Sequence, residues 1–193
     1  MHHKYAFQLS YPARRSTFKD SYYTNGMFLS YKYISKNHPD LVLDFCSKLM
    51  NETDTTRWVA KHALRTLLKK GNQTAMQLFG FGSIQSISTN RFALLDQQIK
   101  IGNASALEIE VINAGKQAQF RLEYAVGYLK KNGSHNEKVF QLREATIQKG
   151  EALTFSKKVD FKDLSTRKHY AGAHYIDLKI NGIPVQRIDF ELL

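Results

Sequence analysis

The side chains with the clearest chemistry lie on one segment, between positions 55 and 70. Arg65 and Lys69 could contact the phosphates of a nucleic-acid backbone, and Trp58 could offer a flat stacking surface, as could His62. These four residues recur at i, i+4, i+7 and i+11 and therefore share one face of a predicted helix. The same pattern also fits an ordinary solvated helix face with a half-buried Trp58, which the pattern alone favours.

Metal and nucleophile chemistry finds little support in the sequence. His169 and His174 are five residues apart with no Glu between them, which is not the spacing of a helical zinc site. His169 more simply belongs to a basic loop with Arg167 and Lys168. No nucleophile elbow, phosphate-binding loop or dinucleotide fingerprint is found, so we expect no metal and no cofactor. Four scattered aspartates are most simply solubilising charges: Asp96, Asp160, Asp163 and Asp177.

The charge balance favours an anionic partner. The 193 residues include 28 Lys and Arg against 17 Asp and Glu, a net charge of +11, and the excess is spread along the chain. Such a field favours nucleic acid through phosphate neutralisation and counterion release, although many basic proteins bind none. No apolar run suits a membrane span or a signal peptide, and the single Cys46 excludes an internal disulfide. We therefore expect a cytoplasmic protein with no membrane partner, in which Cys46 is buried packing.

Before residue 83 the hydrophobic spacing is helical. Residues 1–33 are aromatic, polar and aperiodic, and we expect weak or borrowed structure there. Pro39 suits the first turn of a helix capped by Asn37, and Gly71 suits a C-terminal stop. The helices expected run from Asn37 to about Met50, from a cap at Thr55 or Thr56 to Lys70, and from about Gln73 to Phe79, before Gly80.

After Gly82 the hydrophobic period falls from 3.6 to 2, as in half-buried strands. Turns are expected at Lys131-Asn132-Gly133, Lys149-Gly150 and Asn181-Gly182. The seven strands expected lie near residues 92–101, 107–111, 120–128, 138–143, 153–161, 173–180 and 185–192. This pattern predicts an immunoglobulin-like antiparallel β-sandwich without the usual disulfide, with a boundary near Gly80 to Ser83.

Several runs resemble DNA alkylation repair proteins of the AlkC kind. The run from Trp58 to Asn72 resembles their closing helical repeat, whose pattern is close to V-x-x-H-A-L-R-x-L-x-K-x-G, and Ile34 to Leu43 resembles D-I-x-K-x-H-P-D-L-V. Three runs and a turn in the β part extend the match: Tyr124 to Gly133, Lys138 to Leu142, Thr166 to His174, and Asn181-Gly182. The resemblance covers about residues 34–193, which would be the C-terminal half of such a protein.

The resemblance implies a fold, an activity and a set of site residues. The fold class is a short HEAT-like α-helical repeat segment at 34–82 followed by an immunoglobulin-like β-sandwich at 83–193, after an atypical segment 1–33. Family members wrap duplex DNA and excise cationic methylated bases such as 3-methyladenine. His62 and Arg65 match the positions of an aromatic residue and an arginine that face the damaged nucleotide and the backbone in the related AlkD branch. The DNA-binding residues expected are Trp58, Lys61, His62, Arg65, Lys69, Lys70, Lys130, Lys131, Arg167 and Lys168.

Three functions stay open at this point. The chain could be part of a glycosylase whose other half lies elsewhere, a DNA-binding remnant without activity, or a protein-interaction module. The repeats that carry the family's catalytic carboxylates are not recognised in residues 1–33, so we expect no catalysis by this chain alone. The partners expected are double-stranded DNA, including alkylated DNA, and either a separate N-terminal half or a second copy.

Overall fold

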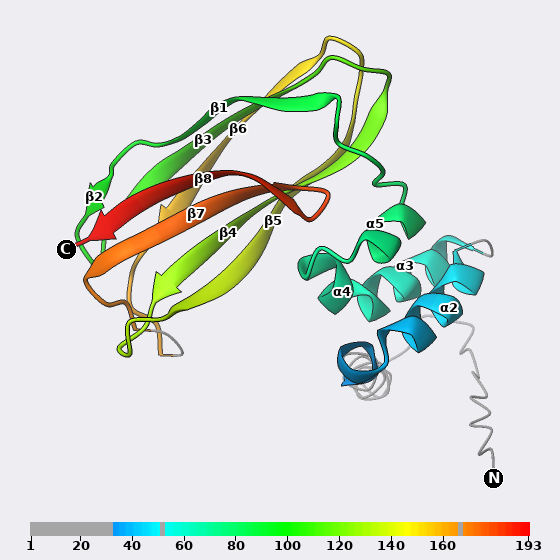
Figure 1. Cartoon of the computed structure of the whole chain (residues 1–193), viewed down its shortest axis with the longest axis horizontal. Coiled ribbons are helices and arrows are strands. Elements are labelled where there is room, and N and C mark those ends of the chain that lie inside the picture. Colours follow the sequence, from blue (N-terminus) through cyan, green and yellow to red (C-terminus); the bar gives the residue numbers. More distant parts are fainter. Residues whose placement is uncertain (1–32, 51–52, 166–167) are drawn as a thin grey trace, which may run out of the picture.

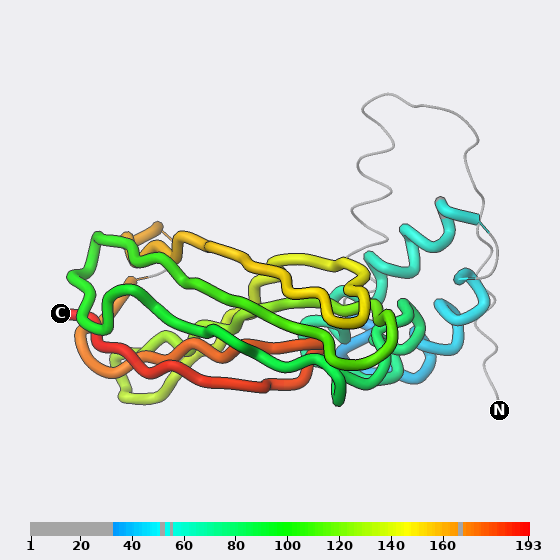
Figure 2. The backbone as a smooth tube through the Cα atoms, turned by 90° about the horizontal axis from the view of Figure 1, so that it is seen from above, coloured from blue at the N-terminus to red at the C-terminus, as the bar shows by residue number. Residues whose placement is uncertain are grey.

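The computed structural model describes residues 33–50, 53–165 and 168–193, and Figure 1 traces the whole chain. The expectation for residues 1–32 and the site residue Arg167 lie outside the described residues. The helices gather at one end of an elongated β part, and the C-terminus lies at its other end, as Figures 1 and 2 both show.

The helical part consists of short helices around a small core. Its bounds are α2 (Pro39–Leu49), α3 (Asp54–Ala63), α4 (Arg65–Lys69) and α5 (Gln73–Leu78), and residues 33–37 are helical as well. α2 buries Val42 and Cys46 in the same cluster as Ala60 of α3 and Met76 of α5. Cys46 is fully buried, which confirms its packing role, and burial raises the pKa of its thiol to about 12.

The helix ends differ in part from the prediction. The expected caps at Asn37 and at Thr55 or Thr56 are wrong. His38 precedes α2 without a side-chain cap, and Thr53 caps α3. Thr53 and Thr56 form a reciprocal capping box, in which each backbone N–H donates to the other hydroxyl, at 2.9 and 3.2 Å. The stop at Gly71 is confirmed: its φ is +72°, and the N–H of Asn72 returns to the carbonyl of Leu67.

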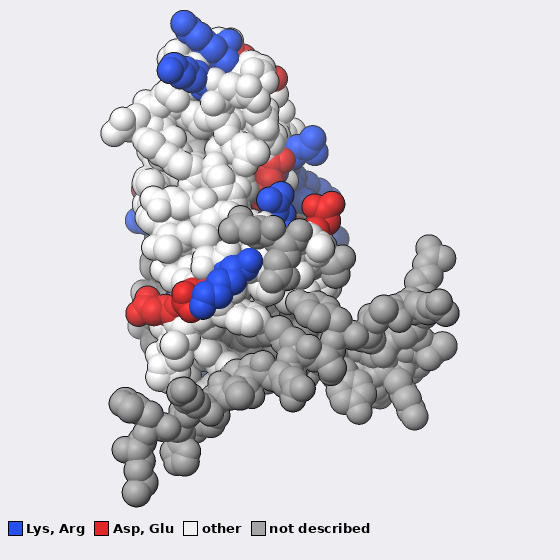
Figure 3. Space-filling model, turned by 90° about the vertical axis from the view of Figure 1, so that its right-hand side faces the viewer, with Lys and Arg blue, Asp and Glu red and all other residues white. Residues whose placement is uncertain are grey.

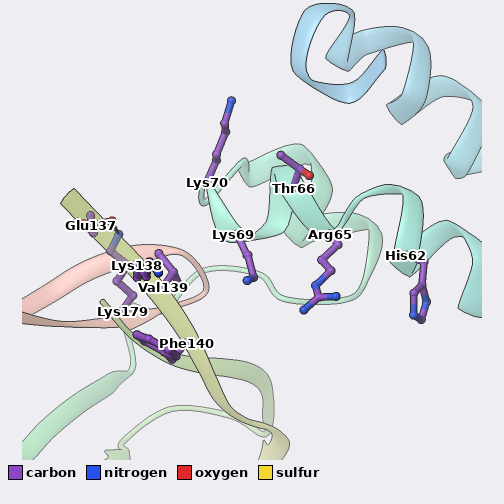
Figure 4. A pocket seen from close by; sticks show the side chains of 10 residues that line it. All are labelled: His62, Arg65, Thr66, Lys69, Lys70, Glu137, Lys138, Val139, Phe140 and Lys179. Atoms are coloured by element: carbon purple, nitrogen blue, oxygen red, sulfur yellow. Dashed lines mark hydrogen bonds and ion pairs between the residues drawn. The ribbon is translucent and has the colours of Figure 1, made fainter. Parts of the chain in front are cut away.

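The predicted second helix is interrupted at Leu64. This residue, with φ −85° and ψ 0°, ends α3 and precedes α4. The N–H of Leu64 still bonds to Ala60 and its carbonyl still accepts from Leu68, both at 2.9 Å, so the interruption is local. Figure 4 shows that His62 and Arg65, on either side of the break, still point the same way.

Within the part of the chain that the structure describes, eight strands form two sheets. The three-stranded sheet has the order β1-β3-β6 and the five-stranded sheet the order β2-β8-β7-β4-β5, antiparallel except where β2 pairs with β8. Their bounds are β1 (Ile87–Leu94), β2 (Gln98–Ile99), β3 (Ala104–Asn113), β4 (Ala118–Leu129), β5 (His135–Ile147), β6 (Ala152–Asp160), β7 (Gly172–Ile180) and β8 (Ile183–Leu192). The strand predicted over 92–101 is therefore two strands, because the segment after Leu94 turns away from β3 and meets β8.

The core of the β part lies between the two sheets. Alternate residues of β3, Leu107, Ile109 and Val111, are fully buried and belong to one cluster with Phe120 and Leu122 of β4. Because alternate residues of a strand point to opposite faces, this burial leaves Arg121 and Glu123 of β4 on the outer face of the five-stranded sheet. Both are nevertheless buried, at 3% and 1% exposure, where the helical part approaches.

The helical part meets the five-stranded sheet at a joint made of Gly71, Gln73, Gly82, Asn181 and Gly182. A Cβ on Gly71 would lie 2.5 Å from the carbonyl oxygen of Gly182, so the α4–α5 turn and the β7–β8 turn touch through backbone. Gln73 Nε2 donates to the carbonyl of Asn181 at 3.2 Å, and Asn181 Nδ2 donates to that of Gly82 at 2.9 Å. No pattern in the sequence predicted this joint.

The predicted fold class, a HEAT-like helical repeat segment followed by an immunoglobulin-like sandwich, is wrong as a description of the whole chain. Strands hold 47% of the described residues and helices 23%, arranged as two sheets and five short helices. Hydrophobic spacing showed which side of each helix is buried, but it could not show which element that side packs against. The short helices pack on one another and on the end of a sheet, rather than stacking as repeats.

Candidate nucleic-acid interface

A cavity of about 1200 Å³ opens between α3 and α4 on one side and β5 on the other (Figure 4). Its described lining residues are His62, Arg65, Thr66, Lys69, Lys70, Glu137, Lys138, Val139, Phe140 and Lys179. A second cavity of about 450 Å³ shares five of these, His62, Arg65, Lys69, Val139 and Phe140, and adds Lys61, Leu68, Arg121, Tyr124, Gln141 and Lys157. We call the two together the basic groove.

The helix side chains divide into two directions in Figure 4. His62, Arg65 and Lys69 extend toward β5, whereas Lys70 extends to the opposite side of α4. The i, i+3, i+7 spacing of the first three explains this alignment, because such residues share a helix face. The structure thus brings His62, Arg65 and Lys69 together on one wall of the groove, whereas Trp58 is not among the lining residues of either cavity.

The groove is strongly basic. Among the described residues that line it, Glu137 is the only acid, and it accepts from Lys179 at 2.6 Å. Lys61 is also neutralised, since it forms an ion pair with Glu144 of β5. Arg65, Lys138 and Lys157 are exposed and make no ion pair with the described residues. Elsewhere, on the face shown in Figure 3, the described basic side chains lie in small separate groups, some of them beside acidic side chains, and form no continuous patch.

Aromatic surfaces accompany these charges. On β5, Phe140 stacks on Tyr124 of β4, with ring centroids 5.0 Å apart and planes inclined by 15°. On α3, Trp58 is 51% exposed and its ring centroid lies 4.0 Å from that of His62. The half-buried Trp58 expected from the sequence is confirmed. Flat rings beside cations suit a ligand that has both phosphates and bases.

The remaining predicted site residues lie far from the groove. Lys130 and Lys131 form the β4–β5 turn, at the end of the sheet away from the helices (Figure 1). Lys168 is exposed on the segment before β7, at the same end. The structure therefore gives two separate basic regions rather than one continuous stripe.

Sequence reasoning missed the β side of the groove. Lys138 and Phe140 were assigned to a predicted strand, and Lys157 and Lys179 to two others. The strands were visible as alternating patterns, but which of them lies beside α4 depends on the joint at Gly71 and Gly182. The run Lys138 to Leu142, already noted for its resemblance, was the one signal pointing to β5.

Histidines at the far end serve the fold. His174 is buried: its Nδ1 accepts the N–H of Leu129 at 3.2 Å, and its Nε2 lies 2.9 Å from the carbonyl of Tyr170. Burial lowers the pKa of His174 below its ordinary value. His169 lies in a loop as expected, but its ring is buried against Tyr128 and Phe161. Within the described ranges, no group of three His, Cys, Asp or Glu could hold a metal ion.

The aspartates are not merely solubilising. Asp177 is 6% exposed and accepts two hydrogen bonds from Arg187, at 2.6 and 2.8 Å. Asp163 accepts the N–H of His169 at 2.8 Å, and this contact lowers the pKa of its carboxyl. They hold the β7–β8 hairpin and the segment before β7 in place, and neither lines the groove. None of the described helices is long and apolar enough to cross a membrane.

Comparison with known proteins places the chain in a family. Residues 88–193 match the family described as uncharacterised protein YhaZ, C-terminal Ig-like domain, and the chain belongs to that family. The chain is 36% identical to the uncharacterized protein YhaZ of Bacillus subtilis (strain 168) over 159 residues. This alignment covers 82% of this chain and 44% of that protein.

The structure is similar to a solved DNA repair enzyme. The Pseudomonas fluorescens alkylpurine DNA glycosylase AlkC, bound to DNA containing an abasic site analog, superimposes with a TM-score of 0.84 and 28% identity, over 89% of this chain and 48% of that one. The resemblance to AlkC seen in the sequence is thus confirmed in three dimensions. The chain spans about half the length of both relatives.

Proposed function

We propose that this chain belongs to a DNA alkylation repair system and binds the backbone of duplex DNA in the basic groove. The observation that carries the proposal is the groove itself, where cations from α4 and β5 converge with one acid among its described lining residues. The similarity to AlkC, whose structure was solved with DNA, supports the ligand class. Alkylated DNA and a cytoplasmic location belong to the same proposal.

Arg65 and Lys138 are the best placed of these cations. They come from opposite walls of the groove and make no ion pair with described residues, so each can neutralise a phosphate without first losing a partner. Lys69 extends beside Arg65 and adds a third positive charge. Phe140 and the Trp58–His62 pair offer surfaces to a sugar or base edge beside those phosphates.

We propose a DNA-binding role without catalysis for this chain on its own. Excision of a base needs a carboxylate placed to stabilise positive charge on the sugar and to orient water. The acid in the groove, Glu137, is engaged by Lys179. In the proposed division of labour, residues 34–82 and 83–193 hold DNA together, as the C-terminal half of an AlkC-like protein would, while the catalytic carboxylates lie elsewhere.

The test is a salt titration of duplex binding. The logarithm of the association constant falls linearly with the logarithm of salt concentration, with a slope of about 0.9 per phosphate contact. We expect Arg65→Ala and Lys138→Ala each to lower that slope by about one. Lys48→Ala is the matched control, because Lys48 is exposed on α2 and pairs with Asp44, outside the groove.

A slope unchanged in both groove variants would overturn the placement of DNA in the groove. If the chain binds no duplex, or if its affinity does not change with salt concentration, the proposal of DNA binding itself is overturned. That second result would favour the alternative of a protein-interaction module.

A further inference from the structure

A chain of ion pairs links α3 to the five-stranded sheet. Lys61 of α3 pairs with Glu144 Oε2 of β5, and Glu144 Oε1 accepts from Arg121 Nη1 of β4 at 2.5 Å. Arg121 also donates from Nε and Nη2 to Glu123 Oε1, at 2.9 and 2.7 Å. We call Lys61, Glu144, Arg121 and Glu123 the charge relay.

The sheet end of the relay is fixed. The side chains of Arg121 and Glu123 are 3% and 1% exposed, so their positions are set by packing as well as by charge. The backbone N–H of Arg121 donates to Asn181 Oδ1 at 2.7 Å, which ties the relay to the joint between the helices and the β7–β8 turn. Burial raises the pKa of the Glu123 carboxyl, against the opposing effect of Arg121.

The helix end of the relay is the more exposed one. Lys61 and Glu144 are 40% and 21% exposed, and they meet beside the smaller cavity of the groove. The joint at Gly71 and Gln73 holds the α4–α5 turn, whereas Lys61 lies on α3, before the interruption at Leu64. Ala60 and Ala63 hold α3 to the other helices in their shared core, and the Lys61–Glu144 pair joins α3 to β5, on the side of the helix that carries His62.

We propose that Glu144 is a positioning residue, which holds α3 beside β5 through Lys61 and so sets the width of the basic groove. The inference rests on the proposed function, because the width of the groove affects binding only if DNA occupies the groove. On this proposal Lys61 is a tether rather than the phosphate contact that the sequence predicted, because it pairs with Glu144.

The variant Glu144→Gln separates positioning from simple electrostatics. Removing an acid makes the groove more positive, so a purely electrostatic role of Glu144 predicts tighter DNA binding. Loss of the tether predicts weaker binding, by roughly two- to thirtyfold, the range for residues that act through others. Tighter or unchanged binding by Glu144→Gln would overturn the proposal.

Lys61→Met and Lys61→Arg complete the set. We expect Lys61→Met to weaken binding by a similar factor with an unchanged salt slope, because no phosphate contact is lost. Arg65→Ala, in contrast, lowers the slope by about one. Lys61→Arg keeps the ion pair and should restore the affinity. A slope that falls by about one in Lys61→Met would show Lys61 to be a phosphate contact and would overturn the tether.

Hydrogen exchange tests the tether without DNA. In Lys61→Met and Glu144→Gln we expect amide hydrogens of α3 to exchange several-fold faster, while those of β3 in the core keep their wild-type rates. Unchanged exchange in α3 would overturn the positioning role. If the wild-type chain binds no duplex, the proposed function fails, and α3 exchange alone then decides whether the relay holds the helix.

Discussion

Replacing Gly71 by Ala tests the contact that holds the two parts of the molecule together. Gly71 has a φ of +72°, and an added Cβ would lie 2.5 Å from the carbonyl oxygen of Gly182. The left-handed backbone costs an L-residue about 1–2 kcal/mol. The overlap with backbone forces the α4–α5 turn away from Gly182, and the Gln73–Asn181 hydrogen bond, worth about 1 kcal/mol, is lost as well. We therefore expect a total destabilisation of about 3 kcal/mol.

Gly133→Ala is the matched control. Gly133 has a similar φ of +79°, in the β4–β5 turn, but nothing lies within 4 Å of the position that an added methyl group would take. It should lose about 1–2 kcal/mol, the backbone cost alone. Urea unfolding, followed by the fluorescence of the single Trp58 and by circular dichroism, measures both. Equal losses in the two variants would refute the packing argument, since the Gly71–Gly182 contact would then contribute nothing.

Four further expectations concern other parts of the chain. The pKa of His174 is lowered in the folded state, so the unfolded chain takes up the proton first as the pH falls. The free energy of unfolding should therefore fall as the pH drops below about 6.5, and it should fall less steeply in His174→Gln. Equal pH profiles of the two proteins would contradict this. Cys46, buried with a pKa of about 12, should react with iodoacetamide at pH 8 only after denaturation; rapid native labelling would show access. If the β4–β5 turn is a second DNA contact, the double variant Lys130→Ala, Lys131→Ala should lower the salt slope by up to two. An unchanged slope would rule out this second contact. The chain alone should release no 3-methyladenine from alkylated duplex, which multiple-turnover release would disprove.

Local features of the fold could be read from the sequence because they depend on neighbouring residues. Alternating apolar residues predicted β3, β4 and β6, and the expected turn at Asn181-Gly182 is present, with φ of +49° and +75°. The stop at Gly71 was predicted for the same reason. The cap of α3 was misplaced because several threonines stand together, and which of them caps depends on the geometry of the first turn.

Long-range features could not be read in this way. Arg65 and Lys69 were predicted to share a helix face, and they do, but nothing in their spacing showed that β5 would form the opposite wall. Lys61 illustrates the limit best. By composition it was one more cation, and only the position of Glu144, 83 residues later, shows that its charge is already neutralised. Helical repeats were expected from a local resemblance, whereas the packing partner of those helices is a distant turn.

Asn181 has a consequence for the order in which the molecule can be assembled. Its carbonyl and side chain bind Gln73, Gly82 and the backbone of Arg121, and Gln73 lies 108 residues before it. On the ribosome the helices are therefore made long before the turn that receives them. The contact of Gly71 and Gln73 with the β7–β8 turn can form only after β7 and that turn have been synthesised, so this side of the helices is uncovered until then. A nascent chain stalled before Asn181 would have its described helices but would lack the turn that Gly71 and Gln73 contact.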